Sequence, residues 1–219
     1  LIDHHLHPPV DGYAVQFSDT HACSTSYIVY QLLEALAGTD AIDQAMAESL
    51  YVGIMTDTGN FSFSSLTSDL FRAVAVLIDK GVNVPYVNSS VYNNFSEGRM
   101  RLLGYMLNDK MVTDYEFGVA YVSLTEEEMR RFDFIQGDSE GFVNYPLSIR
   151  GIRMSAMFIQ TKHSIRVSLR SRGEVDVNVF ARRYFDGGGH RNAAGGKSYV
   201  PMNETLENFR KYLREYFGA

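Results

Sequence analysis

Asp3, His4 and His5 are the first residues of the chain whose types could do chemistry, and they follow two apolar residues. If that apolar pair ends a buried parallel strand, the three side chains emerge at its carboxyl end, where open α/β sheets bind ligands. Neighbouring side chains on an extended backbone point in different directions, so one histidine can bind a metal while the other faces a substrate. Asp3 can orient an imidazole. A solvated turn is the alternative.

Asp57 is a second candidate, in the segment 53–61. It lies between two threonines and before a glycine, where an apolar segment ends. A carboxylate in such a turn suits a hard cation. A simple Asp-Gly-type turn without a ligand is the alternative, and it is the commoner use of this pattern.

A glycine-rich cluster over residues 187–196 is the third candidate, with Gly188, Gly189 and His190 at its centre. Consecutive glycines let backbone N–H groups come close to an anion, as phosphate-binding loops do. His190 adds a donor whose charge changes near neutral pH, and Arg191 adds a cation. A flexible turn would explain the glycines, but the histidine that follows them favours a ligand.

Arg170 is the fourth candidate. Strand alternation places Ser168 and Arg170 on one face, from which the guanidinium can bind phosphate through two parallel hydrogen bonds. An exposed polar edge strand is the alternative. Arg99 and Arg101 are expected to be solvated helix charges.

The composition narrows the function classes. The 219 residues are 45% hydrophobic and 21% charged, which is ordinary for a globular protein. A net charge of −6 argues against a protein that coats long nucleic acid, but not against a small anionic substrate. The single cysteine, Cys23, cannot form an internal disulfide and is expected to be structural. No apolar run approaches the ~18 residues of a membrane span, so a cytoplasmic protein is expected.

One strand and three helices are expected in the first part of the chain. The strand covers 13–18, and the helices cover 25–36, 40–55 and 67–80, with Phe71 facing the core. A further helical stretch over 85–107 is expected to bridge two domains. Because a parallel strand at the start needs earlier βα units, we expect sequence upstream of Leu1.

The second part mixes strands and helices. A hairpin signal joins 111–113 to 119–124, and a capping box at Thr125 predicts a short helix. Strands over 152–159 and 165–169, a helix capped by Asp176, a last strand at 199–200 and a helix over 204–217 follow. The pattern predicts an α/β unit followed by a mixed α+β unit, with a ligand in the cleft between them.

These motifs together resemble those of the DHH phosphoesterase family. Residues 2–5 resemble the motif that names the family, 53–61 its later aspartate motif, and 187–195 the Gly-Gly-Gly-His loop of its DHH-associated C-terminal domain. The runs 167–171 and 175–178 are also similar to that domain. The resemblance implies the C-terminal part of a parallel-sheet DHH domain over 1–84, a helical linker over 85–110, and a smaller α+β mixed-sheet domain over 111–219.

Within the family, the chain most resembles the branch of oligoribonucleases that also hydrolyse adenosine 3′,5′-bisphosphate (pAp). The resemblance implies two Mn²⁺ or Mg²⁺ ions that activate a water for attack on phosphorus. It implies that His4 and Asp57 are metal ligands, that His5 faces the scissile phosphate, and that Asp3 supports the histidines. The family takes its other metal ligands from two motifs upstream of the DHH motif. We therefore expect the natural protein to be longer, and residues 1–219 alone to bind metal poorly.

The resemblance also implies that Gly188, Gly189 and His190 hold the terminal phosphate or nucleotide of the substrate, with Arg170 assisting. The substrates would be short oligonucleotides or pAp, and a homodimer through the first domain is compatible with this function. The alternatives within the family are a RecJ-like exonuclease on single strands, a cyclic-di-AMP phosphodiesterase and an exopolyphosphatase. An inactive nucleotide-binding sensor is the alternative from a different class.

Overall fold

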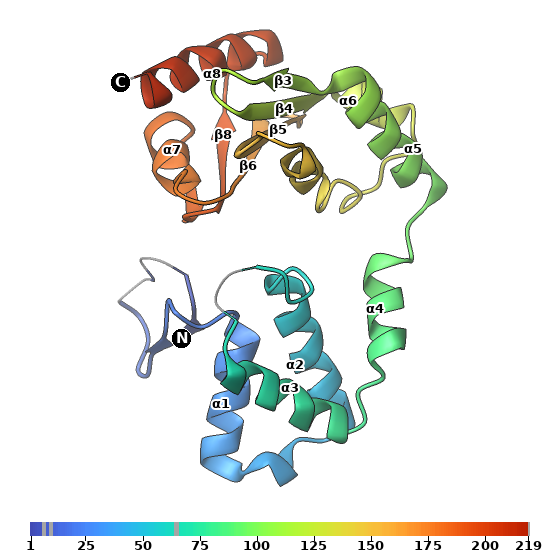
Figure 1. Cartoon of the computed structure of the whole chain (residues 1–219), viewed down its shortest axis with the longest axis vertical. Helices are drawn as coiled ribbons and strands as arrows, with labels where there is room; N and C mark the ends of the chain where they lie inside the picture. Colours follow the sequence, from blue (N-terminus) through green and yellow to red (C-terminus); the bar gives the residue numbers. More distant parts are fainter. Residues whose placement is uncertain (6–7, 9–10, 64–65, 219) are drawn as a thin grey trace. The chain divides into compact units, whose positions relative to one another are not determined.

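The chain folds into two compact units, Leu1–Asn94 and Phe95–Ala219, and each is described by itself. The computed structural model describes residues 1–5, 8, 11–63 and 66–218 (Figure 1). No helix in this described part is long and apolar enough to cross a membrane. The expected fold class is confirmed, because the first unit combines helices with a parallel pair of strands and the second combines helices with a mixed sheet.

The segment expected to form one helical bridge is two helices. They are α4 (Val84–Tyr92), which belongs to the first unit, and α5 (Glu97–Tyr105), which belongs to the second. The helix breaks because Ser96 is extended and caps α5, its side chain accepting a hydrogen bond from the Arg99 amide. A short π-helix, η2 (Met106–Lys110), continues α5.

The strands of the first unit are shorter and more exposed than expected. β1 (Ile2–Asp3) and β2 (Phe17–Ser18) pair in parallel, so the parallel strand at the start is confirmed, whereas the strand expected over 13–18 is reduced to two residues. Ile2 is 39% exposed and Phe17 is 46% exposed, so the expectation of a buried strand is wrong. The physical reason is that the described sheet has two strands, with α1 packed against β1.

Most of the core of the first unit comes from α1 (Thr25–Ala37), α2 (Gln44–Asp57) and α3 (Ser68–Asp79), and Val87 of α4 joins it. The helix expected from residue 40 begins later, because Asp43 caps α2 by accepting from the Met46 amide, and residues 39–41 form a separate 3-10 turn. Phe71 is 49% exposed instead of buried, because its ring packs on that of Phe61 beside the core.

The second unit is a six-stranded sheet in the order β3-β4-β5-β6-β8-β7. β4 and β5 run parallel and the other pairs are antiparallel, so the hairpin and the mixed sheet are confirmed. The strand expected at 199–200 is wrong, because β8 ends at Ser198 and Pro201 already caps the last helix. The strands are β3 (Val112–Asp114), β4 (Val119–Leu124), β5 (Met154–Gln160), β6 (Ile165–Ser171), β7 (Gly188–His190) and β8 (Ala193–Ser198).

Helices pack on both faces of the sheet, and the second face is covered only in part. On the first face, α7 (Val177–Tyr184) and α8 (Met202–Phe217) enclose a core with Phe158 and Phe209 at its centre (Figure 1). On the second face, α5 and the 3-10 helix η3 (Phe142–Ser148) cover β4 and β5. The short helix α6 (Glu126–Arg130) follows β4 and has the expected capping box.

Arg99 is a structural residue, contrary to the expectation of a solvated helix charge. Its side chain is 8% exposed and donates hydrogen bonds to the backbone carbonyl oxygens of Asp138 and Glu140, the latter at 2.8 Å. The guanidinium also stacks on the rings of Phe95 and Phe142, 4.0 and 4.8 Å from their centroids. Arg101 is exposed and pairs with Glu97 along α5, as a solvated charge should.

Candidate functional site

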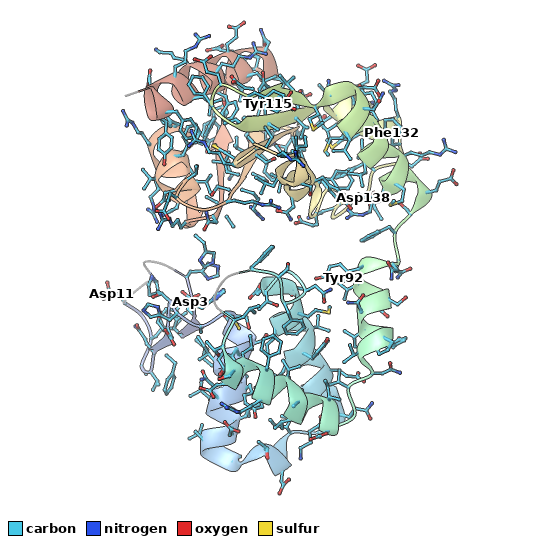
Figure 2. The ribbon with its side chains drawn as sticks, in the orientation of Figure 1. Asp3, Asp11, Tyr92, Tyr115, Phe132 and Asp138 are labelled. Atoms are coloured by element: carbon cyan, nitrogen blue, oxygen red, sulfur yellow. The ribbon has the colours of Figure 1, made fainter. Side chains whose placement is uncertain are left out.

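Asp3, His4 and His5 lie at the carboxyl end of β1, as the sequence predicted (Figure 2 labels Asp3). The imidazole rings of His4 and His5 do not diverge, since their centroids are 4.7 Å apart with planes at 76°. The expected divergence fails because β1 ends at Asp3 and His5 lies in a bend, where strand alternation no longer applies.

His4 is held between a backbone carbonyl and a carboxylate. Its Nδ1 lies 3.3 Å from the Ala22 carbonyl oxygen, and its Nε2 lies 3.7 Å from Oδ2 of Asp57. A carbonyl oxygen can only accept, so Nδ1 carries a proton, and in a neutral ring the Nε2 lone pair faces Asp57. Two electron-rich atoms are stable in this arrangement when a cation or a proton lies between them. The pair therefore fits a metal ion bound by one imidazole and one carboxylate.

The turn that follows α2 fixes the position of Asp57 and is conformationally strained. Asp57 is the last residue of α2, where a negative charge opposes the helix dipole. Thr58 is buried, donates back into the helix at 2.7 Å and accepts from the Phe61 amide at 3.1 Å. Gly59, Asn60 and Phe61 have φ of 56°, 56° and 58°, a left-handed conformation that costs energy for the two non-glycine residues. An unfavourable charge on a strained turn is typical of a functional position.

Asp3 orients His5 and not His4. Its Oδ1 accepts from His5 Nδ1 at 2.8 Å and from the His5 amide at 3.3 Å. The hydrogen bond from the His5 side chain is the largest cause that lowers the pKa of Asp3, so Asp3 is ionised near neutral pH. The sequence did not predict the Ala22 carbonyl group that orients His4, because every residue has a backbone acceptor and the residue types do not show which one is used.

In the second unit, strand pairing sets four residues in one row across the sheet. Ser155 pairs with Arg170, Arg170 with Ala193, and Ala193 with His190. Directly paired residues in antiparallel strands share a face. Because Val167 and Leu169 of the same strand point into the α7–α8 core, Arg170 belongs to the opposite face of the sheet, as the alternation predicted.

Arg170 is partly buried in this row. Its Nη1 donates to the Leu169 carbonyl oxygen at 2.9 Å, and burial is the larger influence on its pKa, which is lowered. Ser155 beside it is fully buried, and its hydroxyl has no hydrogen-bond partner in the described part of the chain. A desolvated guanidinium binds an anion more strongly than an exposed one does, because water competes less for it.

The glycine cluster is a β-hairpin, whereas the sequence predicted an anion-binding loop, with a flexible turn as the alternative. Gly188 and His190 lie in β7 and pair with β8. A Cβ on Gly187 would approach the Gly195 carbonyl oxygen to 2.0 Å, and a Cβ on Gly189 would approach the Ala193 carbonyl oxygen to 2.5 Å. These two glycines are therefore required by the close approach of two backbones.

Gly188 is different from its two neighbours. A Cβ there would meet the flexible side chain of Arg182, at 3.3 Å. Strand pairing puts Gly188 beside Gly195, and Gly195 beside Ser168, so that two positions without side chains lie next to the Arg170 row. Packing does not require a glycine at position 188. Space for a ligand would explain why this position has no side chain.

Side-chain amides and an ion pair anchor the hairpin. Asn178 of α7 accepts from the Gly189 amide at 3.0 Å, and the Asn192 amide donates to Ser171 at 2.9 Å. Arg191, expected to offer a further cation, pairs with Glu174 at 2.5 Å. The turn that carries Arg191 directs its side chain along the surface to this partner, so Arg191 serves the hairpin.

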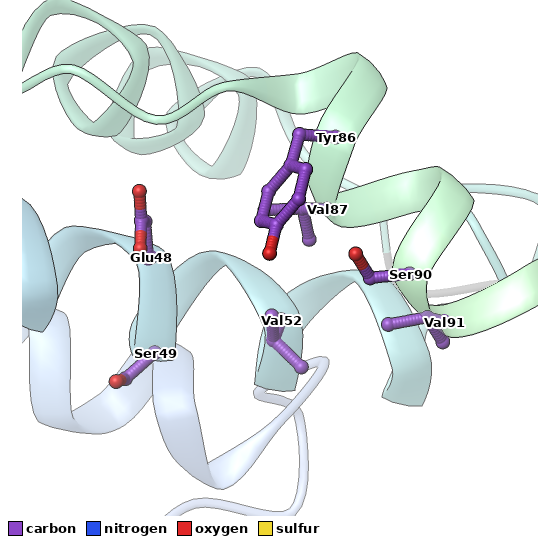
Figure 3. A pocket seen from close by; sticks show the side chains of 7 residues that line it. All are labelled: Glu48, Ser49, Val52, Tyr86, Val87, Ser90 and Val91. Carbon is purple, nitrogen blue, oxygen red and sulfur yellow. The ribbon is translucent and has the colours of Figure 1, made fainter. Parts of the chain in front are cut away.

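A groove lies between α2 and α4 in the first unit (Figure 3). Its lining includes Val52, Tyr86 and Val91, and Glu48 is the one charged residue among the lining side chains. A groove with a single carboxylate has no positive group to hold phosphate. The first unit therefore offers the histidines as a candidate site, and the second unit offers the Arg170 row as another.

Comparison with known proteins identifies relatives of this chain. Residues 115–219 match the DHHA1 domain model. The bifunctional oligoribonuclease and PAP phosphatase NrnA of Bacillus subtilis is 32% identical over 203 residues, which are 90% of this chain and 62% of that protein. The cyclic-di-AMP phosphodiesterase GdpP of Bacillus subtilis is 28% identical over 99% of this chain and 32% of that protein.

A solved structure is similar over nearly the whole chain. The crystal structure of an exopolyphosphatase-related protein from Bacteroides fragilis superposes with a TM-score of 0.92 at 40% identity, over 98% of this chain and 63% of that one. The chain thus spans less than two thirds of the length of its NrnA relative from Bacillus subtilis. The resemblance stated from the sequence is confirmed: residues 115–219 form a DHHA1 domain, and the chain is homologous to DHH phosphoesterases.

Proposed function

We propose that the chain is part of a metal-dependent phosphoesterase that hydrolyses short oligonucleotides and pAp. The observation that carries this proposal is the approach of His4 Nε2 to Asp57 Oδ2, 3.7 Å apart. The homology to NrnA supports the choice of substrate. The net charge of −6 favours a short substrate over a long polymer.

His4 and Asp57 would hold one Mn²⁺ or Mg²⁺ ion, and the family resemblance implies a second ion in a complete site. A bound divalent ion lowers the pKa of a coordinated water and polarises the phosphoryl group. Asp3 Oδ1 lies 2.8 Å from His5 Nδ1, so the Nε2 atom of His5 would be the one that faces the scissile phosphate. The homodimer and the cytoplasmic location remain expectations, which sedimentation and cell fractionation test.

Four residues of the second unit would bind the terminal phosphate or nucleotide of the substrate. Gly188 and Gly189 would let the hairpin backbone come close to the terminal phosphate, and His190 would add a donor, whereas the Gly189 N–H already donates to Asn178 Oδ1. Arg170, desolvated in the same row, supplies the positive charge.

A hydrolysis panel on the natural full-length protein tests the function. The substrates are pAp, 5′-phosphorylated diadenylate, cyclic-di-AMP, pyrophosphate and a long single-stranded DNA, each with Mn²⁺ and with EDTA. We expect turnover of pAp and the dinucleotide with Mn²⁺ and none with EDTA. Fast cleavage of the long DNA would favour the RecJ-like alternative. Cleavage of pyrophosphate would favour an activity on phosphoanhydride bonds, the class of bond that an exopolyphosphatase also hydrolyses. Nucleotide binding without any turnover would favour the sensor.

Substitution of Asp57 tests the metal assignment. In the full-length protein we expect Asp57→Asn and His4→Ala each to weaken Mn²⁺ binding by about 100-fold or more, because each removes a direct ligand where even indirect partners are worth about 10–100-fold. Electron paramagnetic resonance of free Mn²⁺ measures the affinity. His21→Ala is the matched control, since His21 is an exposed histidine of the same unit with no assigned ligand role. Unchanged Mn²⁺ affinity in Asp57→Asn would contradict the assignment.

A further inference from the structure

One side-chain oxygen of α7 joins the glycine hairpin to an arginine. β7 is the last strand in the order of the sheet, so α7 can reach the outer side of its backbone. There Oδ1 of Asn178 accepts from the Gly189 amide at 3.0 Å and from Nε of Arg182 at 3.1 Å. Asn178 is 7% exposed. Because one buried oxygen receives both donors, it orients the Arg182 guanidinium relative to the hairpin.

The guanidinium of Arg182 lies against Gly188. A Cβ at Gly188 would be 3.3 Å from Nη2 of Arg182 and 3.4 Å from its Cζ and Nε. Three atoms of the planar group at nearly equal distances mean that its flat face is turned toward this glycine. With Nε donating to Asn178, the edge that carries Nη1 and Nη2 still has donors for two oxygens of one phosphate.

The charge of Arg182 has no ion-pair partner within the residues that the structure describes. Asn178 is neutral, so it orients the guanidinium without compensating its charge. The two other arginines beside the hairpin are already engaged. Arg183 lies over the ring of Tyr184, 5.1 Å from the centroid, and Arg191 pairs with Glu174. Arg182 is therefore an oriented cation that remains able to bind an anion.

We infer that Arg182 binds the terminal phosphate of the ligand at the glycine hairpin, and that Asn178 is the residue that positions it. This inference rests on the proposed nucleotide site in the second unit. β8 lies between β7 and β6, the strand that carries Arg170, so a second positive charge joins that of Arg170. A phosphate monoester carries nearly two negative charges at neutral pH, whereas a diester carries one. The hairpin therefore favours a ligand that ends in a phosphate monoester.

Calorimetry on the whole chain without metal tests Arg182. The ligands are AMP and adenosine 5′-methyl phosphate, in which the phosphate is a diester. We expect the wild-type chain to bind AMP at least about tenfold more tightly than the methyl ester, because hydrogen bonds between charged groups strengthen with charge. Arg182→Gln should weaken AMP binding by at least about tenfold, the loss expected for one such hydrogen bond, and should lower the preference for AMP by at least about threefold.

Arg183→Gln is the matched control. It removes the same charge from the next residue of α7, and we expect it to change AMP affinity by less than about twofold. Both arginines are exposed, so both variants are expected to fold. Equal losses in the two variants would overturn the inference, because the change in net charge would explain both.

Asn178→Asp tests the positioning role. The carboxylate keeps an acceptor for Gly189 and for Arg182, so thermal stability measured by circular dichroism should be unchanged or higher. AMP binding should weaken by about tenfold, because a guanidinium paired with a carboxylate attracts a phosphate less. The same change in the Arg182→Gln background should cost less than about threefold. A role limited to holding the hairpin predicts wild-type AMP affinity in Asn178→Asp, which would overturn the positioning role.

The results separate this inference from the proposed function. Turnover in the hydrolysis panel together with wild-type AMP affinity in Arg182→Gln would overturn the inference alone. The expected losses in AMP binding, without turnover by the natural full-length protein, would overturn the proposed function alone. A wild-type chain that does not bind AMP, or that binds it no better than the methyl ester, would also overturn the inference.

Discussion

Single residues of the glycine cluster serve two different purposes. Gly189 has a φ of +148°, and a Cβ there would also lie 2.8 Å from the Ala194 Cα. This contact and the 2.5 Å approach to the Ala193 carbonyl oxygen are both with backbone atoms, which cannot move without breaking the hairpin. Gly188, in contrast, faces a side chain that can swing away. The two neighbours should therefore respond differently to the same added methyl group.

We expect Gly189→Ala to lower the free energy of unfolding of the second unit by about 2–4 kcal/mol, from backbone strain and overpacking together. Gly188→Ala should cost less than about 1 kcal/mol and weaken AMP binding by about tenfold, because the methyl group occupies ligand space. Chemical denaturation followed by circular dichroism and calorimetry measure the two effects. Gly104→Ala, at a helical glycine with nothing within 4 Å, is the control. Wild-type AMP affinity in Gly188→Ala would refute the ligand role of Gly188.

Among the elements, the junction of α5, η2 and α6 depends on one carboxylate. Glu128 accepts from the Thr125 amide at 2.8 Å in the capping box, from Lys110 Nζ at 2.5 Å and from the Tyr105 hydroxyl at 2.8 Å. Burial is the largest influence and would raise the pKa of Glu128, but these hydrogen bonds together outweigh it and lower the pKa to about 2. One ionised side chain thus joins three helical segments.

A depressed pKa in the folded state makes stability depend on pH in a known direction. The pKa of Glu128 is about 2 in the folded state and higher in the unfolded state. The ionised carboxylate therefore contributes fully to the free energy of unfolding above about pH 5, and this contribution is lost as the pH falls toward 2. We expect Glu128→Gln to reduce stability at pH 7 by about 1–2 kcal/mol, allowing for screening by solvent, and to change it little at pH 2. Hydrogen exchange in the second unit, with Glu127→Gln as control, measures this. Equal losses at both pH values would be inconsistent with it.

At the scale of the whole molecule, each hydrophobic cluster of the described residues draws its members from one unit. The cluster of the first unit draws its members from residues 30–87, with partners up to Tyr92, and the clusters of the second unit draw theirs from 102–217. Each unit has its own apolar core and its own helix caps, and a domain with these features can fold alone.

We therefore expect the fragment 95–219 to fold without the first unit. It should show a cooperative thermal transition by circular dichroism and bind AMP within about threefold of the whole chain, because the Arg170 row and the glycine hairpin lie entirely within it. It should hydrolyse nothing, because the proposed metal ligands lie in the other unit. A fragment that stays unfolded would show that the second unit depends on the first.

The sequence by itself determined the features that depend on neighbouring residues. The caps at Ser24, Thr67, Thr125 and Asp176, the hairpin over 111–124 and the alternation that puts Arg170 on one face follow from short-range hydrogen bonds and from the period of the strand. The motifs around His4 and Asp57 were also visible, because they are contiguous in the chain.

Only the tertiary structure decided how distant residues meet. It brought Asp57 to His4 across 53 positions of sequence, buried Arg99 under a loop some 40 residues away, and turned the glycine cluster into paired strands. It also showed that Gly189 is required by packing and Gly188 is not. These outcomes depend on which backbones approach each other, and a linear pattern of residue types does not contain that information, because long-range contacts are chosen by the packing of the whole unit.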